Sequence, residues 1–352
     1  MRFLLFPLAF LYGLITALRN QLYDYGLFKS YASTLKTIGI GNLQVGGSGK
    51  TPTTAWIYTL LKDQENIAIL SRGYGRQTKG LIEADNKATP GQIGDEPMWY
   101  KTHLKEARIV VSEKREAGLR WLEKTNSTMV LLDDAFQHRA VSLDIQILLT
   151  EYRKPFYKDF LLPVGRLRES RQGAGRADIV VVTKCPNNIS EAQMADIRTR
   201  IQSQTTAMVF FTGMTYGLPY DILNGAPLQV PQSGQVLAVS GLANPSDFVE
   251  QCKQYGQVEA ISFPDHYKYK PADIEKLNSK LIGNNKVICT EKDAVKLLDS
   301  ELKHLLMPGK YYALPVQPKL LNFNENDFKH VLLETLKQTQ KHKAFKLNVK
   351  KD

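Results

Sequence analysis

The sequence contains little cysteine, which argues against two classes of protein. Its three cysteines, Cys185, Cys252 and Cys289, stand far apart in 352 residues and form no CxxC pair. A disulfide-bonded scaffold and a cysteine-based zinc site are therefore not expected. The low cysteine content fits a protein that works in a reducing cytoplasm.

The N-terminal apolar run is too short to predict a membrane-spanning helix. Residues 3–18 carry no charge and lie between Arg2 and Arg19, whereas a spanning helix needs about 20 apolar residues. No convincing cleavage site of small residues ends the run, which argues against a secretory signal. A buried core helix is one alternative. We expect instead a membrane-associated helix within residues 1–30 that lies in one leaflet. The side chains expected to face lipid include Phe3, Phe6, Phe10 and Tyr12.

Acidic residues are also fewer than basic ones. The sequence has 35 aspartates and glutamates and 46 lysines and arginines, so the net charge is +11. This excess suits an anionic partner, which would be nucleic acid, an acidic membrane surface or a phosphorylated substrate. No nucleic-acid-binding motif is present, so nucleic acid is not expected. A solvated basic surface is the alternative, and the tail at 337–352, with six lysines and one acid, accounts for part of the charge. No obligate protein partner is evident.

Aliphatic runs alternate with helical segments along most of the chain. The runs at 36–40, 67–70, 108–111, 129–132, 145–149 and 179–182 are apolar on both faces, as in strands of a buried parallel sheet. The pattern predicts an α/β fold that resembles the P-loop NTPases, with a doubly wound, mostly parallel sheet. Further strands are expected at 236–239, 258–263, 287–289 and 311–314. We therefore predict a P-loop kinase domain at 31–216, a linker at 217–234 and a smaller C-terminal α/β domain at 235–336.

The strongest local motif is a glycine-rich loop between a predicted strand and a predicted helix, G-N-L-Q-V-G-G-S-G-K-T-P at 41–52. Such a loop points successive backbone N–H groups at one anion, and the start of the helix adds a partial positive charge. Lys50 can reach the β- and γ-phosphates, and Thr51 can offer its hydroxyl to Mg²⁺. Gln44 departs from the strict motif, which has glycine there. The residues expected to bind the nucleotide are Gly46, Gly47, Ser48, Gly49, Lys50 and Thr51.

Two carboxylates follow the predicted strand at 129–132. A P-loop needs an acid at the end of a neighbouring strand to hold the metal, and Asp133 and Asp134 meet that requirement. Since successive strand residues point to opposite faces, one of the two is expected to face the metal directly. The sequence does not decide which. A polar strand end before a turn is the alternative for the pair.

Several other polar residues have two possible roles. Asp95 in G-D-E-P either caps a helix or acts as a catalytic base for an acceptor hydroxyl. His138 is either structural or supports the site. His266 stands beside Asp265, and a carboxylate can orient an imidazole and raise its basicity. Arginines with either a surface role or an anion-binding role are Arg72, Arg115, Arg166, Arg168, Arg171 and Arg176.

Taken together, these motifs resemble those of the tetraacyldisaccharide 4'-kinases of lipid A biosynthesis. The resemblance rests on the glycine-rich loop at 41–52, S-R-G-Y-G-R at 71–76, G-D-E-P at 94–97 and D-D-x-F-Q-H at 133–138, in this order. It covers most of the chain, including the apolar leader and T-E-K-D-A at 290–294. Ala135 and Arg166 depart from the family pattern, which has glycine and proline there, while a residue other than glycine at position 44 is within it.

The resemblance implies an ATP- and Mg²⁺-dependent lipid kinase that phosphorylates the 4'-hydroxyl of a tetraacyl disaccharide 1-phosphate. Lys50 and Thr51 would serve the ATP phosphates and Mg²⁺, with Asp133 or Asp134 completing the metal site. Asp95 would be the catalytic base, assisted by His266. Arg72 and Arg115 would bind phosphate or substrate. The leader helix would rest on the cytoplasmic face of the bacterial inner membrane, as a peripheral or monotopic element.

Two other classes of function remain as alternatives. A GTPase would need a carboxylate in an N/T-K-x-D motif, and Thr183-Lys184-Cys185-Pro186 ends in proline, which argues against guanine binding. A basic module that binds membranes without catalysis would keep its binding after Lys50→Ala, whereas a kinase would lose transfer.

Overall fold

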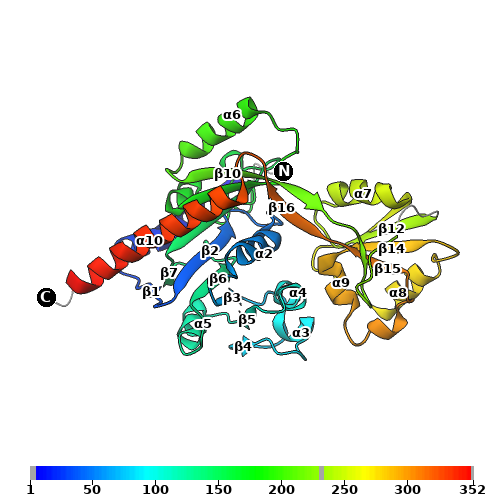
Figure 1. Ribbon diagram of the computed structural model, residues 1–352. Helices are drawn as coiled ribbons and strands as arrows, with labels where there is room; N and C mark the ends of the chain where they lie inside the picture. Colours follow the sequence, from blue (N-terminus) through cyan, green and yellow to red (C-terminus); the bar gives the residue numbers. More distant parts are fainter. Residues whose placement is uncertain (1–4, 230–233, 350–352) are drawn as a thin grey trace. The chain divides into compact units, whose positions relative to one another are not determined.

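The computed structural model describes residues 5–229 and 234–349, which fall into two compact units (Figure 1). Unit 1 comprises Met1–Arg72, Ala107–Met214 and Pro318–Asp352, and unit 2 comprises Gly73–Glu106 and Thr215–Gln317. The chain therefore passes from one unit to the other more than once. Each unit has its own sheet.

This division differs from the boundaries expected from composition in two places. Residues 73–106 group with the C-terminal segment, although they were expected within the domain at 31–216. Residues from Pro318 onwards group with unit 1, because helix α10 (Glu325–Val349) packs on helix α2 (Lys50–Leu61). There the Trp56 indole donates to Glu325 Oε1 at 2.9 Å and its ring lies 4.7 Å from that of Phe328. Local composition does not reveal such returns of the chain.

The sheet of unit 1 is rich in parallel strands. Its strands lie in the order β16-β10-β9-β8-β2-β6-β3-β5. The neighbouring pairs from β10 to β5 are all parallel. The bounds are β2 (Lys36–Asn42), β3 (Ile67–Ser71), β5 (Arg108–Val111), β6 (Met129–Asp133), β8 (Ile145–Glu151), β9 (Ile179–Thr183), β10 (Met208–Tyr216) and β16 (Val316–Leu320). The expected α/β class with a mostly parallel sheet is confirmed.

The register brings the carboxyl ends of the central strands together. Ile40 of β2 pairs with Asp133 of β6, and Asn42 pairs with Leu149 of β8. These strands are almost fully buried, as strands of a doubly covered parallel sheet should be. The loops that follow β2, β6 and β9 therefore leave the sheet at one edge, where ligands bind in open α/β folds. The other helices of this unit are α5 (Arg115–Leu122) and α6 (Glu191–Gln202), and the short strands β1 (Tyr31–Ala32) and β7 (Val141–Ser142) pair in parallel.

Unit 2 is built on a second sheet with the strand order β11-β15-β14-β12-β13. Helix α7 lies on one face of it, and α8 and α9 lie on the other (Figure 1). Alternate strand residues supply the two cores, since Leu237 and Val239 belong to one and Val236 and Ala238 to the other. The bounds are β11 (Tyr220–Asp221), β12 (Gln235–Ser240), β13 (Gln257–Ser262), β14 (Lys286–Thr290), β15 (Tyr311–Leu314), α7 (Ser246–Cys252), α8 (Pro271–Asn278) and α9 (Glu291–Leu297).

The segment 73–106 contributes helices to unit 2. It contains β4 (Ile82–Glu83), α3 (Pro90–Ile93) and α4 (Asp95–His103). Helix α4 contacts α9. Its His103 Nε2 lies 2.9 Å from the Tyr220 hydroxyl and 3.2 Å from Glu291 Oε1, while His103 Nδ1 lies 2.8 Å from the Trp99 carbonyl oxygen. These polar contacts attach the segment to the C-terminal part of the chain.

Helix α1 (Phe6–Asp24) carries apolar residues on both its buried and its exposed face. The inner face, which includes Ala9 and Thr16, packs on unit 1, and the Tyr12 hydroxyl donates to the Arg168 carbonyl at 2.8 Å. Tyr12 therefore faces protein, so its expected contact with lipid is wrong, and Phe3 lies outside the described residues. The outer face leaves exposed Phe6, Leu8, Phe10, Leu11, Leu14, Ile15 and Leu18.

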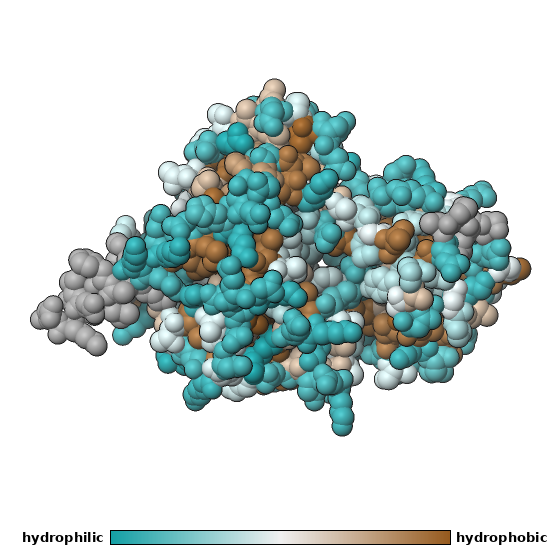
Figure 2. Space-filling view, viewed as in Figure 1, coloured by the Kyte–Doolittle hydropathy of each residue, from teal (hydrophilic) through white to brown (hydrophobic). Residues whose placement is uncertain are grey.

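No helix within residues 5–229 and 234–349 is both long enough and apolar enough to cross a membrane. The face of unit 1 visible in Figure 2 is mostly hydrophilic, with hydrophobic residues in small separate patches. A contiguous exposed apolar row such as that on α1 is typical of an interaction surface.

Candidate active site

The glycine-rich loop joins β2 to α2, the arrangement that the sequence predicts. Gly46 and Gly49 have positive φ angles of 112° and 83°, and residues other than glycine rarely adopt such backbone angles. A Cβ atom added at Gly46 or Gly47 would meet nothing within 4 Å, so the space beside the loop is open. Lys50 begins α2, directly after the left-handed Gly49. The loop therefore presents exposed backbone at a helix N-terminus, where an anion can bind.

The end of β9 and the residue after it hold this loop from behind. The Thr183 hydroxyl donates to the Ser48 carbonyl at 2.9 Å, and Lys184 Nζ donates to the Gly47 carbonyl at 2.7 Å. Glu151 Oε1 at the end of β8 lies 3.1 Å from Lys184 Nζ and fixes that ammonium. In the sequence, Thr183 and Lys184 are notable only as the start of an incomplete guanine-binding motif. In the fold, they support the phosphate loop.

Gln44 has a specific partner that explains its departure from the strict motif. Its side chain is buried, and Nε2 donates to Asp159 Oδ2 at 2.6 Å. Arg166 Nε donates to the same Asp159 oxygen at 3.0 Å. Two residues that depart from the common patterns, Gln44 and Arg166, thus meet on one carboxylate. Their hydrogen bonds tie the phosphate loop to the segment at 159–167.

Asp134 lies beside the phosphate-loop lysine. Lys50 Nζ is 3.7 Å from Asp134 Oδ1, and the Arg168 guanidinium donates to both oxygens of Asp134 at 3.0 and 2.9 Å. Burial alone would raise the pKa of Asp134, but Lys50 and Arg168 outweigh it and lower the pKa to about 2. Asp133 is buried at the end of β6. The two expected metal ligands are therefore adjacent to the loop, and Asp134 is ionised at neutral pH.

The two arginines expected to bind substrate lie in different environments. Arg72 is exposed at the end of β3. Arg115 is 1% exposed, and its guanidinium donates to the carbonyl oxygens of Ser112 and Asp133, both at 2.8 Å. The Arg115 side chain thus supports the backbone at Asp133 and is not displayed to solvent.

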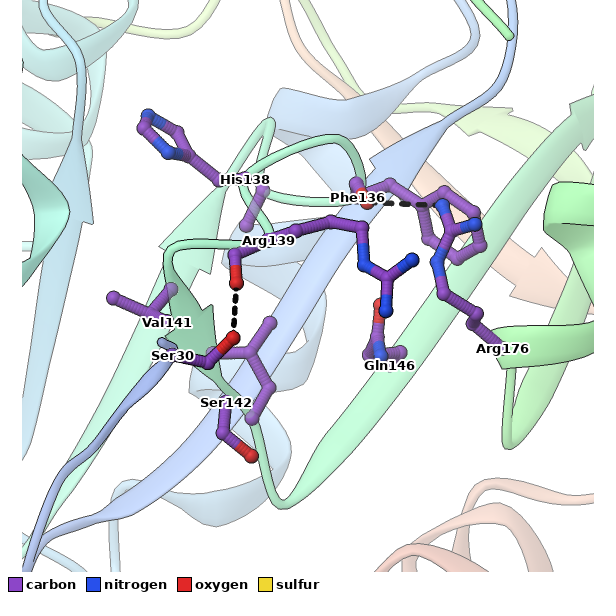
Figure 3. Close-up of a pocket in the computed structure, with 10 residues that line it drawn as sticks. Ser30, Phe136, His138, Arg139, Val141, Ser142, Gln146 and Arg176 are labelled. Atoms are coloured by element: carbon purple, nitrogen blue, oxygen red, sulfur yellow. Dashed lines mark hydrogen bonds between the residues drawn. The ribbon is translucent and has the colours of Figure 1, made fainter. Parts of the chain in front are cut away.

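His138 occupies a half-buried position between two hollows of unit 1. One, of about 120 Å³, is shown in Figure 3, where the His138 ring points away from the guanidinium groups of Arg139 and Arg176. Burial and the nearby Arg115 and Arg72 lower the pKa of His138 to about 4, so its ring is neutral at pH 7. Arg176 pairs with the buried Glu169 at 2.8 Å, and its guanidinium lies over the Phe136 ring. These side chains form a structural cluster.

Four of the arginines with a surface or an anion-binding role already have partners. Arg166 pairs with Asp159, Arg168 with Asp134 and Arg176 with Glu169, while Arg171 donates to the Asp159 carbonyl. Paired arginines attract an added anion less strongly than unpaired ones, because their charge is already compensated. The geometry of these arginines therefore does not support an anion-binding role for them.

Unit 2 brings together Asp95 and His266, which are 171 positions apart in the sequence. His266 Nδ1 lies 3.6 Å from Asp95 Oδ2, and the His266 ring meets Tyr74 edge-on at 5.5 Å between centroids. Asp95 is the first residue of α4, where an acid suits the start of the helix, and the N-cap residue is Gly94. Its carboxylate also faces the imidazole. The geometry is consistent with both roles open to Asp95.

Two lysines of α9 complete this cluster. Lys296 Nζ lies 3.6 Å from Asp95 Oδ2, and Lys292 Nζ lies 3.6 Å from Glu96 Oε1. Burial would raise the pKa of Asp95, but His266, Lys296 and Lys292 together lower it. The lysines stand one helical turn apart, which places them on one face of α9. The i, i+4 spacing of the two lysines is visible in the sequence, but it predicts no role for either residue.

Strained backbone coincides with these sites. Among the described residues, the non-glycine positions with positive φ are Asp134 at 47°, Lys184 at 55° and His266 at 59°. Such angles cost of order 1–3 kcal/mol each and persist where the surroundings enforce them. All three side chains belong to the clusters described above. The coincidence supports a functional role for these clusters, which belong to two different units.

The donor atoms near the phosphate loop fit magnesium better than a transition metal. They are the Thr51 hydroxyl and the carboxylates of Asp133 and Asp134, and oxygen donors of this kind are the ones magnesium prefers. No cluster of three or more His, Cys, Asp or Glu side chains suited to a metal occurs in the parts of the chain that the structure describes. Magnesium commonly binds through one or two carboxylates together with substrate phosphates, so a dedicated cluster is not required.

Comparisons with known proteins agree with this arrangement. The sequence profile of the tetraacyldisaccharide-1-P 4'-kinase family matches residues 1–337. A tetraacyldisaccharide 4'-kinase from Flavobacterium johnsoniae is 40% identical over 344 residues, covering 96% of this chain and 98% of the relative. One from Bacteroides thetaiotaomicron is 35% identical over 360 residues, covering 97% and 95%.

A solved structure gives the same result. The crystal structure of LpxK from Aquifex aeolicus in complex with ATP superposes with a TM-score of 0.74 at 30% sequence identity, and the match covers 95% of this chain and 99% of that one. The family that the motifs predict is confirmed, and with it the kinase function. The chain therefore belongs to the tetraacyldisaccharide-1-P 4'-kinase family.

Proposed function

We propose that this chain transfers the γ-phosphoryl group of ATP to the 4'-hydroxyl of a tetraacyl disaccharide 1-phosphate, and that the loop at 46–51 holds the donor. The observation that carries the proposal is Lys50, which starts α2 beside an open glycine loop, 3.7 Å from the carboxylate of Asp134. The ATP complex of the Aquifex aeolicus relative supports the choice of nucleotide. The products are ADP and the 4'-phosphorylated lipid.

Backbone N–H groups at 46–49 bind the donor phosphates in this proposal, and Lys50 neutralises the β- and γ-phosphate charge. Ser48 fits this role in a second way. Its hydroxyl is buried and has no hydrogen-bond partner among the described residues. Since buried polar groups are normally satisfied, a phosphate oxygen is a suitable acceptor for it. Thr183 and Lys184 keep the loop in this shape.

Thr51, Asp133 and Asp134 would hold the magnesium ion that accompanies ATP. When bound, the ion would neutralise part of the negative charge of the phosphates. Arg168 orients the carboxylate of Asp134 by holding both of its oxygens. Arg115 acts as a support for Asp133 through the Asp133 carbonyl, and the exposed Arg72 is the arginine available to substrate or phosphate.

Asp95 acts as the base for the acceptor in this scheme. Its lowered pKa keeps it ionised, so that it can accept the proton of the 4'-hydroxyl as the oxygen attacks phosphorus. His266 orients the carboxylate or takes part in carrying the proton away. The donor loop belongs to unit 1, and Asp95 and His266 belong to unit 2.

The outer face of α1 is the membrane contact in this proposal. Its exposed apolar side chains would enter the acyl boundary of the inner membrane's cytoplasmic leaflet, while the inner face stays docked on unit 1. A lipid acceptor with several acyl chains remains in that bilayer. The enzyme then needs to admit only the sugar head group and to remain peripheral or monotopic.

The test is transfer of label from γ-labelled ATP into lipid, with purified protein in detergent, Mg²⁺ and the tetraacyl disaccharide 1-phosphate. Thin-layer chromatography separates the product. Wild type should label the lipid with ATP and far less with GTP, and Lys50→Ala should lose transfer by at least about 100-fold. Unimpaired transfer by a folded Lys50→Ala protein would contradict the donor site. Folded wild type that hydrolyses ATP without labelling lipid would contradict the proposed acceptor.

A further inference from the structure

Lys296 is a buried lysine whose place in the fold calls for a functional explanation. Its side chain is 7% exposed, and Nζ lies 3.6 Å from Asp95 Oδ2 and 3.4 Å from Asp293 Oδ1. The same ammonium lies 6.0 Å from the ring centroid of Tyr269. One cation thus stands between a carboxylate of α4 and a carboxylate of its own helix, α9. Burying such a charge is costly unless its partners are well placed.

Asp293 provides a fixed anchor for this lysine. It is 1% exposed, and its Oδ2 accepts hydrogen bonds from the Gly241 N–H at 2.9 Å and from the Thr290 hydroxyl at 2.6 Å. A Cβ atom at position 241 would come within 3.0 Å of Asp293 Oδ1, so a glycine there permits the close approach. Asp293 is therefore held by two elements, β14 and the loop after β12. The ion pair with Asp293 therefore also restricts the position of the Lys296 ammonium.

The anchored ammonium acts on one oxygen of Asp95. In its pair with Lys296 and in its pair with His266, the nearest oxygen of Asp95 is Oδ2. The other lysine of α9, Lys292, is directed elsewhere, with its Nζ 3.6 Å from Glu96 Oε1 and 3.9 Å from Asp265 Oδ1. Both of these contacts thus fall on Oδ2, and in this scheme Oδ1 is the oxygen that meets an acceptor hydroxyl.

We infer that Lys296 is a positioning residue for phosphoryl transfer, which orients Asp95 toward His266 and the acceptor while anchored on Asp293. The inference rests on the proposed role of Asp95 as the base. It assigns a purpose to the T-E-K-D-A-V-K segment at 290–296 and to Gly241, which have none in the donor site. Lys296 acts on the proton-accepting step, and ATP binding in unit 1 does not depend on Lys296.

The experiment compares Lys296→Met, Lys296→Arg and Lys292→Met in the full-length protein by the lipid-labelling assay. Lys292→Met is the matched control, because it removes the same charge one turn away, from a lysine whose ion pairs are with Glu96 and Asp265. Lys296→Met should lower kcat about 100-fold with an unchanged KM for ATP, since a general base contributes about 10²–10⁴-fold. Lys296→Arg should restore part of that loss, and Lys292→Met should lower kcat much less.

The pH profile separates positioning from a merely structural role. The groups that face Asp95 are His266 and Asp265 from their loop, Lys292, Lys296 and Asp293 from α9, and Glu96 from α4. Loss of the Lys296 charge removes a cation that lowers the pKa of Asp95. The acid limb of kcat in Lys296→Met should therefore move to higher pH, because the base must be ionised. An unshifted acid limb with wild-type kcat would overturn the inference.

Two further variants keep the result interpretable. Should Lys296→Met fail to fold, Lys296→Met/Asp293→Asn removes the buried pair without leaving an uncompensated anion, and it should show the same loss of kcat. Full activity in that folded double variant would overturn the inference. Asp95→Asn tests the underlying role separately. If Asp95→Asn transfers normally, the proposed base is wrong, whereas loss in Asp95→Asn with full activity in Lys296→Met refutes only the role of Lys296.

Discussion

Replacing Phe10, Leu14 and Leu18 on the outer face of α1 with serine is expected to release the protein from lipid vesicles. These side chains are 76%, 57% and 57% exposed, while the opposite face of the helix is docked on unit 1. The triple replacement therefore changes surface hydrophobicity and leaves the docked face, with Ala9 and Thr16, unaltered. Stability in the absence of lipid should remain close to wild type.

The size of the effect follows from the exposed area. Full transfer of a Leu or Phe side chain out of water contributes about 1.5–3 kcal/mol. Scaled by the exposures of these residues, the three side chains together contribute about 3–6 kcal/mol. Since about 1.4 kcal/mol corresponds to a tenfold change in an equilibrium constant, partitioning should fall on the order of 10²–10⁴-fold.

The assay is co-sedimentation of full-length protein with vesicles that contain anionic phospholipid. The matched control is Ile282→Ser in unit 2, which removes a side chain that is 76% exposed but lies outside α1. Wild type and Ile282→Ser should sediment with the vesicles, and the triple variant should stay in the supernatant. Equal sedimentation of the triple variant and wild type would refute the assignment of α1 as the membrane contact.

Two further predictions concern unit 1. Lys184→Met should raise the KM for ATP several-fold with little change in kcat, because it removes the 2.7 Å hydrogen bond to the Gly47 carbonyl that shapes the phosphate loop; steady-state kinetics with varied ATP would measure this, and an unchanged KM would contradict the role. Asp134→Asn should flatten the acid side of the stability profile. The folded pKa of Asp134 is lowered from 3.8 to about 2, so its contribution is present above about pH 4 and is lost as pH falls toward 2. Urea unfolding across that range should be steeper in pH for wild type than for Asp134→Asn, and parallel curves would contradict the pairing with Lys50 and Arg168.

Much of unit 1 could be predicted from local sequence. Strands apolar on both faces, such as 129–132 and 179–182, have one plausible environment, and the glycine loop before Lys50 is a strand-to-helix junction with a chemical purpose. The strand β10 (Met208–Tyr216) was not predicted from the sequence. Local sequence predicts a strand or a loop well where its residues are compatible with only one environment, such as a buried sheet or a phosphate-binding turn.

The remaining features depend on long-range contacts that local sequence does not encode. Composition could not show that Trp56 packs on Phe328, and the domain predicted at 235–336 therefore includes 318–336, which the contacts of the fold group with unit 1. Nor could it show that Arg115 is buried beneath Asp133, or that Lys296 meets Asp95. A lone arginine or lysine in a sequence is equally consistent with a surface charge. Its role becomes visible only when the fold supplies a partner.

The most direct test of the account measures nucleotide binding and phosphoryl transfer separately in Asp95→Asn. Asparagine keeps the size of the side chain but cannot accept the proton, and Asp95 belongs to the unit that does not contain the phosphate loop. The account predicts wild-type affinity for ATP with Mg²⁺ and a loss of lipid phosphorylation of about 10²–10⁴-fold, the range of a general base. Wild-type transfer, or weakened ATP binding that accounts for the whole loss, would contradict the division of donor binding and acceptor activation between the two units.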